Sequence, residues 1–231
     1  MEQLKIIPLE IPERLEEIIS ISWLIFTNQY INQKYEINLE SPFQLHYATI
    51  LKHLGDVYCL KNKEIFMVNL ETNMSLGKNN YIDIAVSIYD LNTDYEYCIQ
   101  IELKYKTLLQ SAENIGVMEI YKDIKFLEDL CYNYKRDKFQ IPFSYLFFIS
   151  ENQRYVNKAK SGLKTVYRTD DGYKIEKGSE YEYSNTKTGK KFYDKYGSFS
   201  FKGNYQFKWQ NYVKDQNYQR WFLKMKICKQ I

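Results

Sequence analysis

Apolar side chains recur at helical spacing near the start of the chain. In residues 13–33 they lie three and four positions apart, which predicts a helix with one buried face. A second helix is expected from Ser41, because Ser41 can cap it, Pro42 suits the first helical position and Gln44 lies three residues after the cap. This helix is expected to end before Gly55, since glycine is typical of helix C-termini.

Shorter apolar runs follow these two helices. Residues 56–60 and 64–70 are expected to be strands. A third helix is expected over residues 111–134, where apolar side chains again share one face. The continuous apolar run FSYLFFIS, residues 143–150, is typical of a strand that is buried on both sides.

The sequence changes character after Ser150. Residues there are rich in Lys, Tyr, Gly, Asn and Ser, and a closing helix is expected at residues 214–226. We interpret residues 1–150 as a core with N-terminal helices, and residues 151–231 as a basic, β-rich extension packed on that core as part of one domain. Three hairpins are expected in the extension, with turns at Asp171-Gly172, Thr188-Gly189 and Gly203-Asn204.

The clearest pattern is a predicted hairpin formed by residues 81–90 and 95–105. Its turn, LNTD, contains residues that tolerate tight turns, and both strands alternate between two faces. If the turn centres on residues 92–93, paired positions sum to about 185, which places Asp83 opposite Glu102. Residues opposed in this way have Cβ atoms about 5 Å apart.

Composition fits one large folded domain. Of the 231 residues, 45% are hydrophobic, so a sizeable core can form. No apolar run reaches the roughly 20 residues of a membrane-spanning helix, and the first residues lack a signal-peptide core. The four cysteines are scattered without a CxxC pair, which argues against a zinc site or a disulfide framework. We therefore expect a cytoplasmic protein without a membrane partner.

Charge is divided unevenly along the chain. Residues 1–150 carry 14 Lys/Arg and 21 Asp/Glu, whereas residues 151–231 carry 18 Lys/Arg and 8 Asp/Glu. This asymmetry suggests a polyanionic partner for the basic part, although a solvated lysine-rich surface is the alternative. Aromatic residues lie between these lysines and could stack on unpaired bases. The candidate nucleic-acid-binding lysines of this part are Lys190, Lys191, Lys202 and Lys208.

The polar face of the hairpin carries the candidate chemistry. Glu102 and Lys104 share that face with Gln100, while the other face is apolar. Two carboxylates as close as Asp83 and Glu102 repel each other unless a cation lies between them, and oxygen ligands of this kind suit Mg²⁺. Lys104 could orient a water molecule or stabilise charge on a phosphate.

Asp83, the hairpin and Glu102-Leu103-Lys104 resemble the motif of the PD-(D/E)XK nuclease superfamily, although Ile82 stands where that motif often has proline. The resemblance covers about residues 40–150. It implies a three-layer α/β/α restriction-endonuclease-like core, with a central mixed sheet of four to five strands. It also implies Asp83 and Glu102 as ligands of Mg²⁺, or of Mn²⁺ instead, and Asp83, Glu102 and Lys104 as the catalytic group.

Further residues are candidates for the same site. The superfamily often has a glutamate in its first core helix, for which Glu40 is the nearest candidate, with Gln44 behind it and Glu64 as a rival. Gln100 could bind a phosphate or a metal-bound water. Lys106 continues the spacing of Lys104 and could meet a phosphate, or simply be solvated. A second acid-x-lysine triplet, Asp123-Ile124-Lys125, is set aside because it lies in a predicted helix.

These features predict a Mg²⁺-dependent endonuclease that hydrolyses DNA, with restriction or defence as its role by analogy with the superfamily. RNA is an alternative substrate, and a homodimer is needed for a symmetric double-strand cut. The alternative function is a catalytically inactive module of the same fold that binds nucleic acid or a protein. A purely structural role is a further alternative, in which Asp83 caps a loop and Glu102 and Lys104 are neighbours on a solvated strand. A nucleotide hydrolase is disfavoured because GxxxxGK[ST] is missing.

Overall fold

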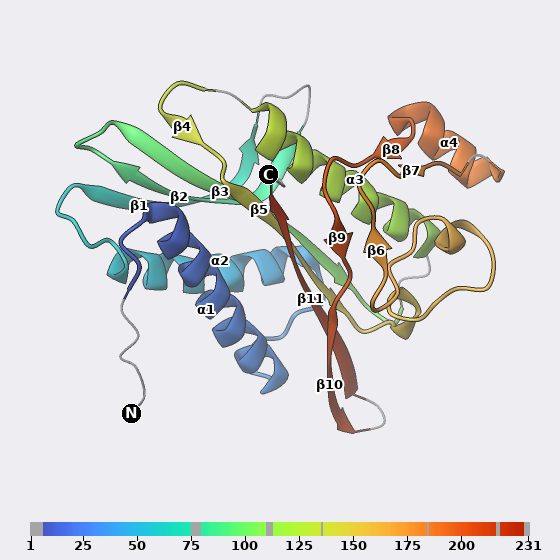
Figure 1. Ribbon diagram of the computed structural model, residues 1–231. Coiled ribbons are helices and arrows are strands. Elements are labelled where there is room, and N and C mark those ends of the chain that lie inside the picture. Colours follow the sequence, from blue (N-terminus) through green and yellow to red (C-terminus); the bar gives the residue numbers. More distant parts are fainter. Residues whose placement is uncertain are drawn as a thin grey trace, which may run out of the picture. The chain divides into compact units, whose positions relative to one another are not determined.

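The computed structural model describes residues 7–74, 80–109, 113–134, 136–183, 185–215 and 218–228. The chain divides into two compact units: unit 1 is Met1–Ile101 with Lys135–Pro142, and unit 2 is Glu102–Tyr134 with Phe143–Ile231. Figure 1 labels their helices and strands. Each unit combines helices and strands, so the expected α/β class is confirmed. None of the helices within these described ranges is both long and apolar enough to cross a membrane.

Two helices of unit 1 lie where the apolar spacing predicts them. α1 (Ile11–Ile31) begins two residues earlier than expected, because Pro12 suits a first helical turn. α2 (Glu40–Val57) begins at Glu40 with Leu39 as its N-cap, so the expected capping role of Ser41 is wrong. The two helices pack against each other through aromatic rings, with the ring centroids of Phe26 and Phe43 4.9 Å apart.

Gly55 lies inside α2 and does not end it. A Cβ atom at Gly55 would lie 2.0 Å from the ring of Phe66, so the missing side chain allows the helix to approach the neighbouring strand. The helix therefore continues to Val57, and the strand expected at residues 56–60 is wrong. The first strand after α2 is β1 (Glu64–Asn73).

The predicted hairpin is confirmed as β2 (Tyr81–Asp90) and β3 (Tyr95–Lys106). The register has the expected sum of 185, with Ile84 paired to Ile101. In unit 1, β1 pairs antiparallel with β2, and the short β4 (Phe139–Gln140) runs parallel to the start of β3. The strand arrangement is therefore mixed. β3 itself belongs to both units, because the boundary falls between Ile101 and Glu102.

Unit 2 contains the second part of β3, α3 (Glu113–Asn133) and the strands β5 (Phe143–Ser150), β11 (Tyr218–Cys228) and β10 (Trp209–Asp215). All eight residues of β5 are buried, as expected from its sequence. β11 pairs antiparallel with β5 on one side and with β10 on the other. α3 packs against β5 and β11. Of the third helix that the sequence predicts, residues 111 and 112 lie outside the described residues.

The helix expected at residues 214–226 is wrong, because this segment lies largely in β11. Buried apolar residues alternate with lysines along this segment, which explains why it forms a strand: Leu223, Met225 and Ile227 are buried, and lysines separate them. Apolar side chains at every second position line one face of a strand, whereas a helix needs them three and four residues apart.

The segment before β10 is more varied than the expected hairpins. It holds η1 (Gln153–Tyr155), η2 (Leu163–Thr165), four two-residue strands and α4 (Lys187–Tyr196). The strands are nested: β6 (Lys174–Ile175) pairs with β9 (Tyr205–Gln206), and β7 (Glu180–Tyr181) pairs with β8 (Phe199–Ser200). The three local hairpins are therefore wrong, since none of these strands pairs with its neighbour across an expected turn.

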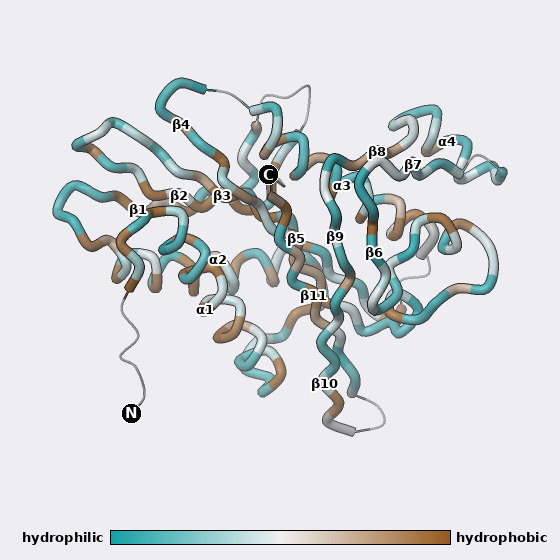
Figure 2. Tube along the Cα trace, in the orientation of Figure 1, coloured by the Kyte–Doolittle hydropathy of each residue, from teal (hydrophilic) through white to brown (hydrophobic). Residues whose placement is uncertain are grey.

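The turn expected at Thr188-Gly189 is instead the first turn of α4. Thr186 caps this helix by accepting a hydrogen bond from the amide of Gly189 at 3.1 Å. Gly197, at φ +72°, ends it in a backbone conformation that favours glycine. Figure 2 shows the contrast within unit 2, with hydrophobic colour along β5 and hydrophilic colour along α4.

Glu128 of α3 holds the loop between β8 and β9. Its fully buried Oε1 accepts hydrogen bonds from the amides of Lys202 and Gly203 at 2.7 and 2.9 Å, and from the hydroxyl of Tyr205 at 2.7 Å. Burial, followed by the bond to Glu128, raises the pKa of Tyr205, so this phenol remains protonated and can donate. A carboxylate with several donors is stable when buried.

Candidate functional site

In unit 2, β3 and α3 bring opposite charges together. Glu102 and Lys104 share one face of β3 because side chains alternate along a strand. Lys104 Nζ lies 2.9 Å from Asp123 Oδ2 of α3 and 3.9 Å from Glu102 Oε2. Lys122 Nζ lies 3.2 Å from Asp123 Oδ1. We call these four residues, Glu102, Lys104, Lys122 and Asp123, the Lys104 cluster.

Three members of the Lys104 cluster are largely removed from water, whereas the side chain of Lys122 is 39% exposed. Glu102 and Asp123 are 5% and 3% exposed, and the side chain of Lys104 is 12% exposed. Burial by itself lowers the pKa of Lys122, but the charge and hydrogen bond of Asp123 outweigh it and the pKa is raised. Lys122 therefore stays protonated, and each carboxylate oxygen of Asp123 faces an ammonium group.

A further ion pair continues this line of charges. Lys106 lies two residues beyond Lys104 on β3, and its Nζ is 3.9 Å from Glu119 Oε2. Glu119 precedes Asp123 by four residues, so both acids lie on one face of α3. The two elements thus face each other with lysines on the strand and acids on the helix. Lys106, a candidate for nucleic-acid binding, lies opposite a carboxylate here.

In unit 1, α2 places Gln44 beside Asp83. Gln44 Nε2 donates to the backbone oxygen of Asp83 at 2.6 Å and to Glu71 Oε1 at 3.0 Å. Asp83 lies near the start of β2 and is half-buried. Glu40 is the first residue of α2, one helical turn before Gln44. The structure therefore brings together Gln44 and Asp83, two of the residues that the sequence selects.

Asp83 and Glu102 belong to different units. The confirmed register ends with the pair Ile84 and Ile101, each adjacent in sequence to one of these acids. Convergence of the two carboxylates on one metal ion stays a prediction. Gln100 is fully buried and donates to Cys98 Sγ at 3.3 Å, so its amide already has a partner in β3.

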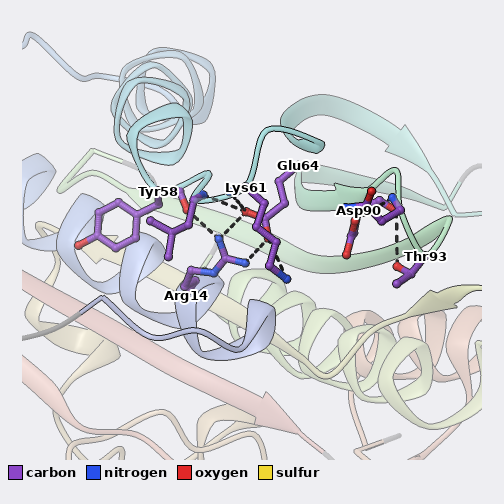
Figure 3. Close-up of polar contacts among 8 residues, drawn as sticks. Arg14, Tyr58, Lys61, Glu64, Asp90 and Thr93 are labelled. Carbon is purple, nitrogen blue, oxygen red and sulfur yellow. Dashed lines mark hydrogen bonds and ion pairs between the residues drawn. The ribbon is translucent and has the colours of Figure 1, made fainter.

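Glu64, the rival of Glu40 as an additional acid, has a different role. Figure 3 shows its carboxylate beside Arg14, which donates to both of its oxygens at 2.6 and 2.7 Å. The amides of Leu60 and Lys61 also donate to it, at 2.9 and 3.2 Å. Both side chains are fully buried, and the Arg14 hydrogen bonds are the main cause that lowers the pKa of Glu64 to about 2. These contacts make Glu64 part of a structural ion pair.

The four candidate lysines of the basic extension, residues 151–231, are exposed but differ in their contacts. Lys190 and Lys191 lie on α4. Lys202 donates to Asn133 Oδ1 at 3.1 Å and lies 5.1 Å from the ring centroid of Tyr132. Lys208 lies between β9 and β10. The structure therefore distributes these four lysines over three places in unit 2.

Asp123 is the residue of the Lys104 cluster that sequence reasoning set aside. As the acid of an acid-x-lysine motif it is excluded, because that motif belongs on a strand and Asp123 lies on a helix. A different signal is in the sequence: Glu119 and Asp123 lie four apart on a helix that follows a strand with Lys104 and Lys106 two apart. Both spacings place like charges on one face, so the strand and helix can pair them.

Comparison with known proteins adds no family to this description. No protein-family model matches the chain, and no curated protein matches it significantly. Within the described ranges, no group of three or more His, Cys, Asp and Glu side chains is arranged to hold a metal ion. The function must therefore be inferred from the residues themselves.

The donor chemistry of the Lys104 cluster suits a hard cation. Glu102 and Asp123 present carboxylate oxygens, which are the ligands that Mg²⁺ prefers. The ammonium groups of Lys104 and Lys122 lie 2.9 and 3.2 Å from Asp123, and Lys104 lies 3.9 Å from Glu102. Glu102 could hold a metal ion, while Asp123 fixes the position of Lys104.

Proposed function

We propose that this protein is a Mg²⁺-dependent endonuclease that hydrolyses DNA phosphodiester bonds, with a three-layer α/β/α core of the restriction-endonuclease type. The observation that carries the proposal is Lys104, which is mostly buried and held between Glu102 and Asp123. An acid and a lysine at this spacing on a strand are the chemical pair that the PD-(D/E)XK motif requires.

In this proposal Glu102 and, from the sequence register, Asp83 hold the metal ion. Bound Mg²⁺ would supply an activated water and would stabilise negative charge on the phosphate. Lys104 presents its ammonium to a phosphate oxygen or to the attacking water, and the ion pair with Asp123 fixes its direction. Because Glu102 and Lys104 are mostly buried, their charges act more strongly than they would in water.

A plasmid-cleavage assay tests this function. The protein should cut DNA with Mg²⁺ and should not cut it in the presence of a chelator. Glu102→Gln and Lys104→Met should each lower the rate about a hundredfold or more, because each removes a charge that acts on the reacting phosphate.

Lys174→Met is the matched control, since Lys174 is an exposed lysine of the same unit, and it should cut at the parent rate. Circular dichroism should show that all three variants fold. Parent-rate cleavage by folded Glu102→Gln or Lys104→Met would contradict the assignment.

A binding module without catalysis is the second candidate, and one contact favours it. The 2.9 Å ion pair with Asp123 holds Lys104 against a carboxylate of α3, as expected of a structural lysine. Under this candidate the protein binds DNA equally well with and without a chelator and yields no products with Mg²⁺ or Mn²⁺. Product formation with either metal excludes it.

A further inference from the structure

A groove lies between α3 and α4 of unit 2. Its cavity measures about 400 Å³. Phe192, which is 8% exposed, lies in the floor, while the lysines of α4 extend into solvent. α3 contributes Ile115, Met118 and Glu119 to the lining, and α4 contributes Thr188, Lys191, Phe192, Lys195 and Tyr196.

The groove is positively charged. Lys191 and Lys195 line it, and within the described part of the chain neither forms a salt bridge. The acid in the lining, Glu119, lies opposite Lys106 at 3.9 Å, so its charge is offset. A concave surface with two unneutralised lysines attracts an anionic ligand.

Tyr196 adds an exposed aromatic ring to this positive surface. It is 38% exposed and packs on Phe192 with ring centroids 4.6 Å apart. Lys195 Nζ and Lys122 Nζ lie 4.8 and 5.8 Å from its ring centroid. Lysines around a partly exposed ring suit a strand with unpaired bases, because the ring can stack on a base while the ammonium groups meet phosphates. Paired bases of a duplex offer no face for such stacking.

The groove is continuous with the Lys104 cluster. Lys122 lies against the ring of Tyr196 and also contacts Asp123 at 3.2 Å. Asp123 in turn contacts Lys104 at 2.9 Å. The side chains of Lys122 and Asp123, two consecutive residues of α3, therefore lie between Tyr196 of the groove and Lys104.

We propose that the groove between α3 and α4 binds single-stranded DNA, with phosphates on Lys191 and Lys195 and a base stacked on Tyr196, and that it leads this strand toward the Lys104 cluster. The part of this inference that concerns cleavage rests on the proposed function. The binding itself does not depend on it, since Lys191, Lys195 and Tyr196 lie outside the cluster.

Fluorescence anisotropy in a chelator tests the groove without cleavage. The probes are a fluorescein-labelled 20-mer of thymidylate and a labelled 20-base-pair duplex. The single strand should bind more tightly than the duplex. The double variant Lys191→Gln/Lys195→Gln should weaken single-strand binding about tenfold and make its logarithmic salt dependence shallower by about 1.4, since two phosphate contacts are lost. Tyr196→Leu, which keeps an apolar contact with Phe192, should weaken it about tenfold through lost stacking.

The matched control is Lys174→Gln/Lys177→Gln, which removes two exposed lysines that line a different cavity of the same unit. It should change single-strand binding less than twofold. Parent affinity of the groove variants would overturn the proposal. Equal affinity for duplex and single strand, or displacement of the probe by poly-glutamate as effectively as by unlabelled DNA, would overturn it as well. The latter result would indicate an acidic protein partner.

A failure of this proposal differs from a failure of the proposed function. Glu102→Gln should bind the single strand like the parent protein and fail to cleave it. If the groove variants bind normally while Glu102→Gln abolishes cleavage, the groove is wrong and the nuclease stands. If the groove variants lose binding while the parent protein never cleaves, the groove stands and the nuclease is wrong.

Discussion

Arg14 and Glu64 show how a buried charge can be made stable at the residue scale. Two hydrogen bonds join the guanidinium to the carboxylate, and two backbone amides add further donors to Glu64. Arg14 also donates to the backbone oxygen of Tyr58 at 2.9 Å (Figure 3). The pair links α1 to the first residue of β1, and the bond to Tyr58 links α1 to the segment between α2 and β1. Removing one partner leaves the other charge buried without compensation, which is costly.

The pKa of Glu64 predicts a pH dependence of stability. Its folded pKa of about 2 lies below the ordinary 4.5, so it contributes stability above pH 4.5 and loses it as the pH falls toward 2. The shift corresponds to on the order of 3 kcal/mol. Denaturant unfolding between pH 7 and pH 2.5 should show this decline in the parent protein.

Glu64→Gln should lower the free energy of unfolding at pH 7 by about 3–5 kcal/mol, because Arg14 loses its counter-charge. The variant should also lose much of the decline with acid. Glu36→Gln, at an exposed position, is the control and should behave like the parent protein. A variant that keeps parental stability at pH 7 would show that the pair contributes nothing.

At the scale of elements, close contact between a helix and a strand depends on Gly55. The ring of Phe66 occupies the space that a side chain at Gly55 would need, and Phe66 is 3% exposed, so the ring has little freedom to move. The pattern of the sequence predicts glycine as a helix end, because glycine favours that place. Packing between α2 and β1 is the reason found here, and it requires knowledge of which strand lies beneath the helix.

Gly55→Ala should destabilise the protein by about 2 kcal/mol, because the added methyl group overpacks against the ring of Phe66. In a Phe66→Leu background, Gly55→Ala should cost less than it does in the parent protein, because the ring that the methyl group would meet is gone. Chemical denaturation of the four proteins gives the coupling energy directly. Additive losses in this cycle would mean that the ring is not the obstacle.

The elements that could be predicted are those whose signals are local. The helices α1 to α3, the hairpin β2–β3 and the strand β5 follow from periodicity, turn residues and apolar runs within short windows. β11 could have been predicted as well, since its alternation is visible, but it was interpreted as a helix. The pairing of β6 with β9 and of β7 with β8 could not, because these two-residue strands are defined by partners far away in the sequence.

The same distinction holds for the candidate site. Glu102 and Lys104 could be selected because strand alternation places them on one face, and their contact follows. The spacing of Glu119 and Asp123 indicates that Asp123 can face a lysine of the preceding strand, but its 2.9 Å contact with Lys104 depends on how α3 packs. Gln44 was selected through resemblance of its helix to a nuclease core helix, and it does contact the backbone of Asp83.

At the scale of the whole molecule, unit 2 is completed by contacts between distant segments. Glu128 binds residues 202–205, which lie more than 70 positions later in the chain. Tyr121 contributes to the same packing, since its ring contacts those of Tyr181 and Phe201 and its hydroxyl donates to the backbone of Arg168. α3 is thus covered by chain that follows β5.

Glu128→Gln should lower the free energy of unfolding by roughly 3 kcal/mol, because a charged acceptor of several buried donors becomes a neutral one. Hydrogen exchange at the amides of Lys202 and Gly203 should accelerate. Asp129→Asn is the matched control. The carboxylate of Asp129, next to Glu128 in sequence, is 33% exposed and pairs with Lys125, so losing its charge should cost less than about 1 kcal/mol. Unchanged exchange at Lys202 in Glu128→Gln would contradict the role of this carboxylate.

The place of β11 between β5 and β10 has a consequence for how the protein is made. While a ribosome synthesises the chain, β5 emerges long before β11. Until Tyr218–Cys228 has been added, the backbone edge of β5 that pairs with β11 has no partner, although the side chains of β5 are apolar. An apolar strand with an open edge readily joins other chains. A nonsense mutation just before Tyr218 should therefore yield a product that aggregates in the cell or is degraded there, even though every residue of the Lys104 cluster is still encoded.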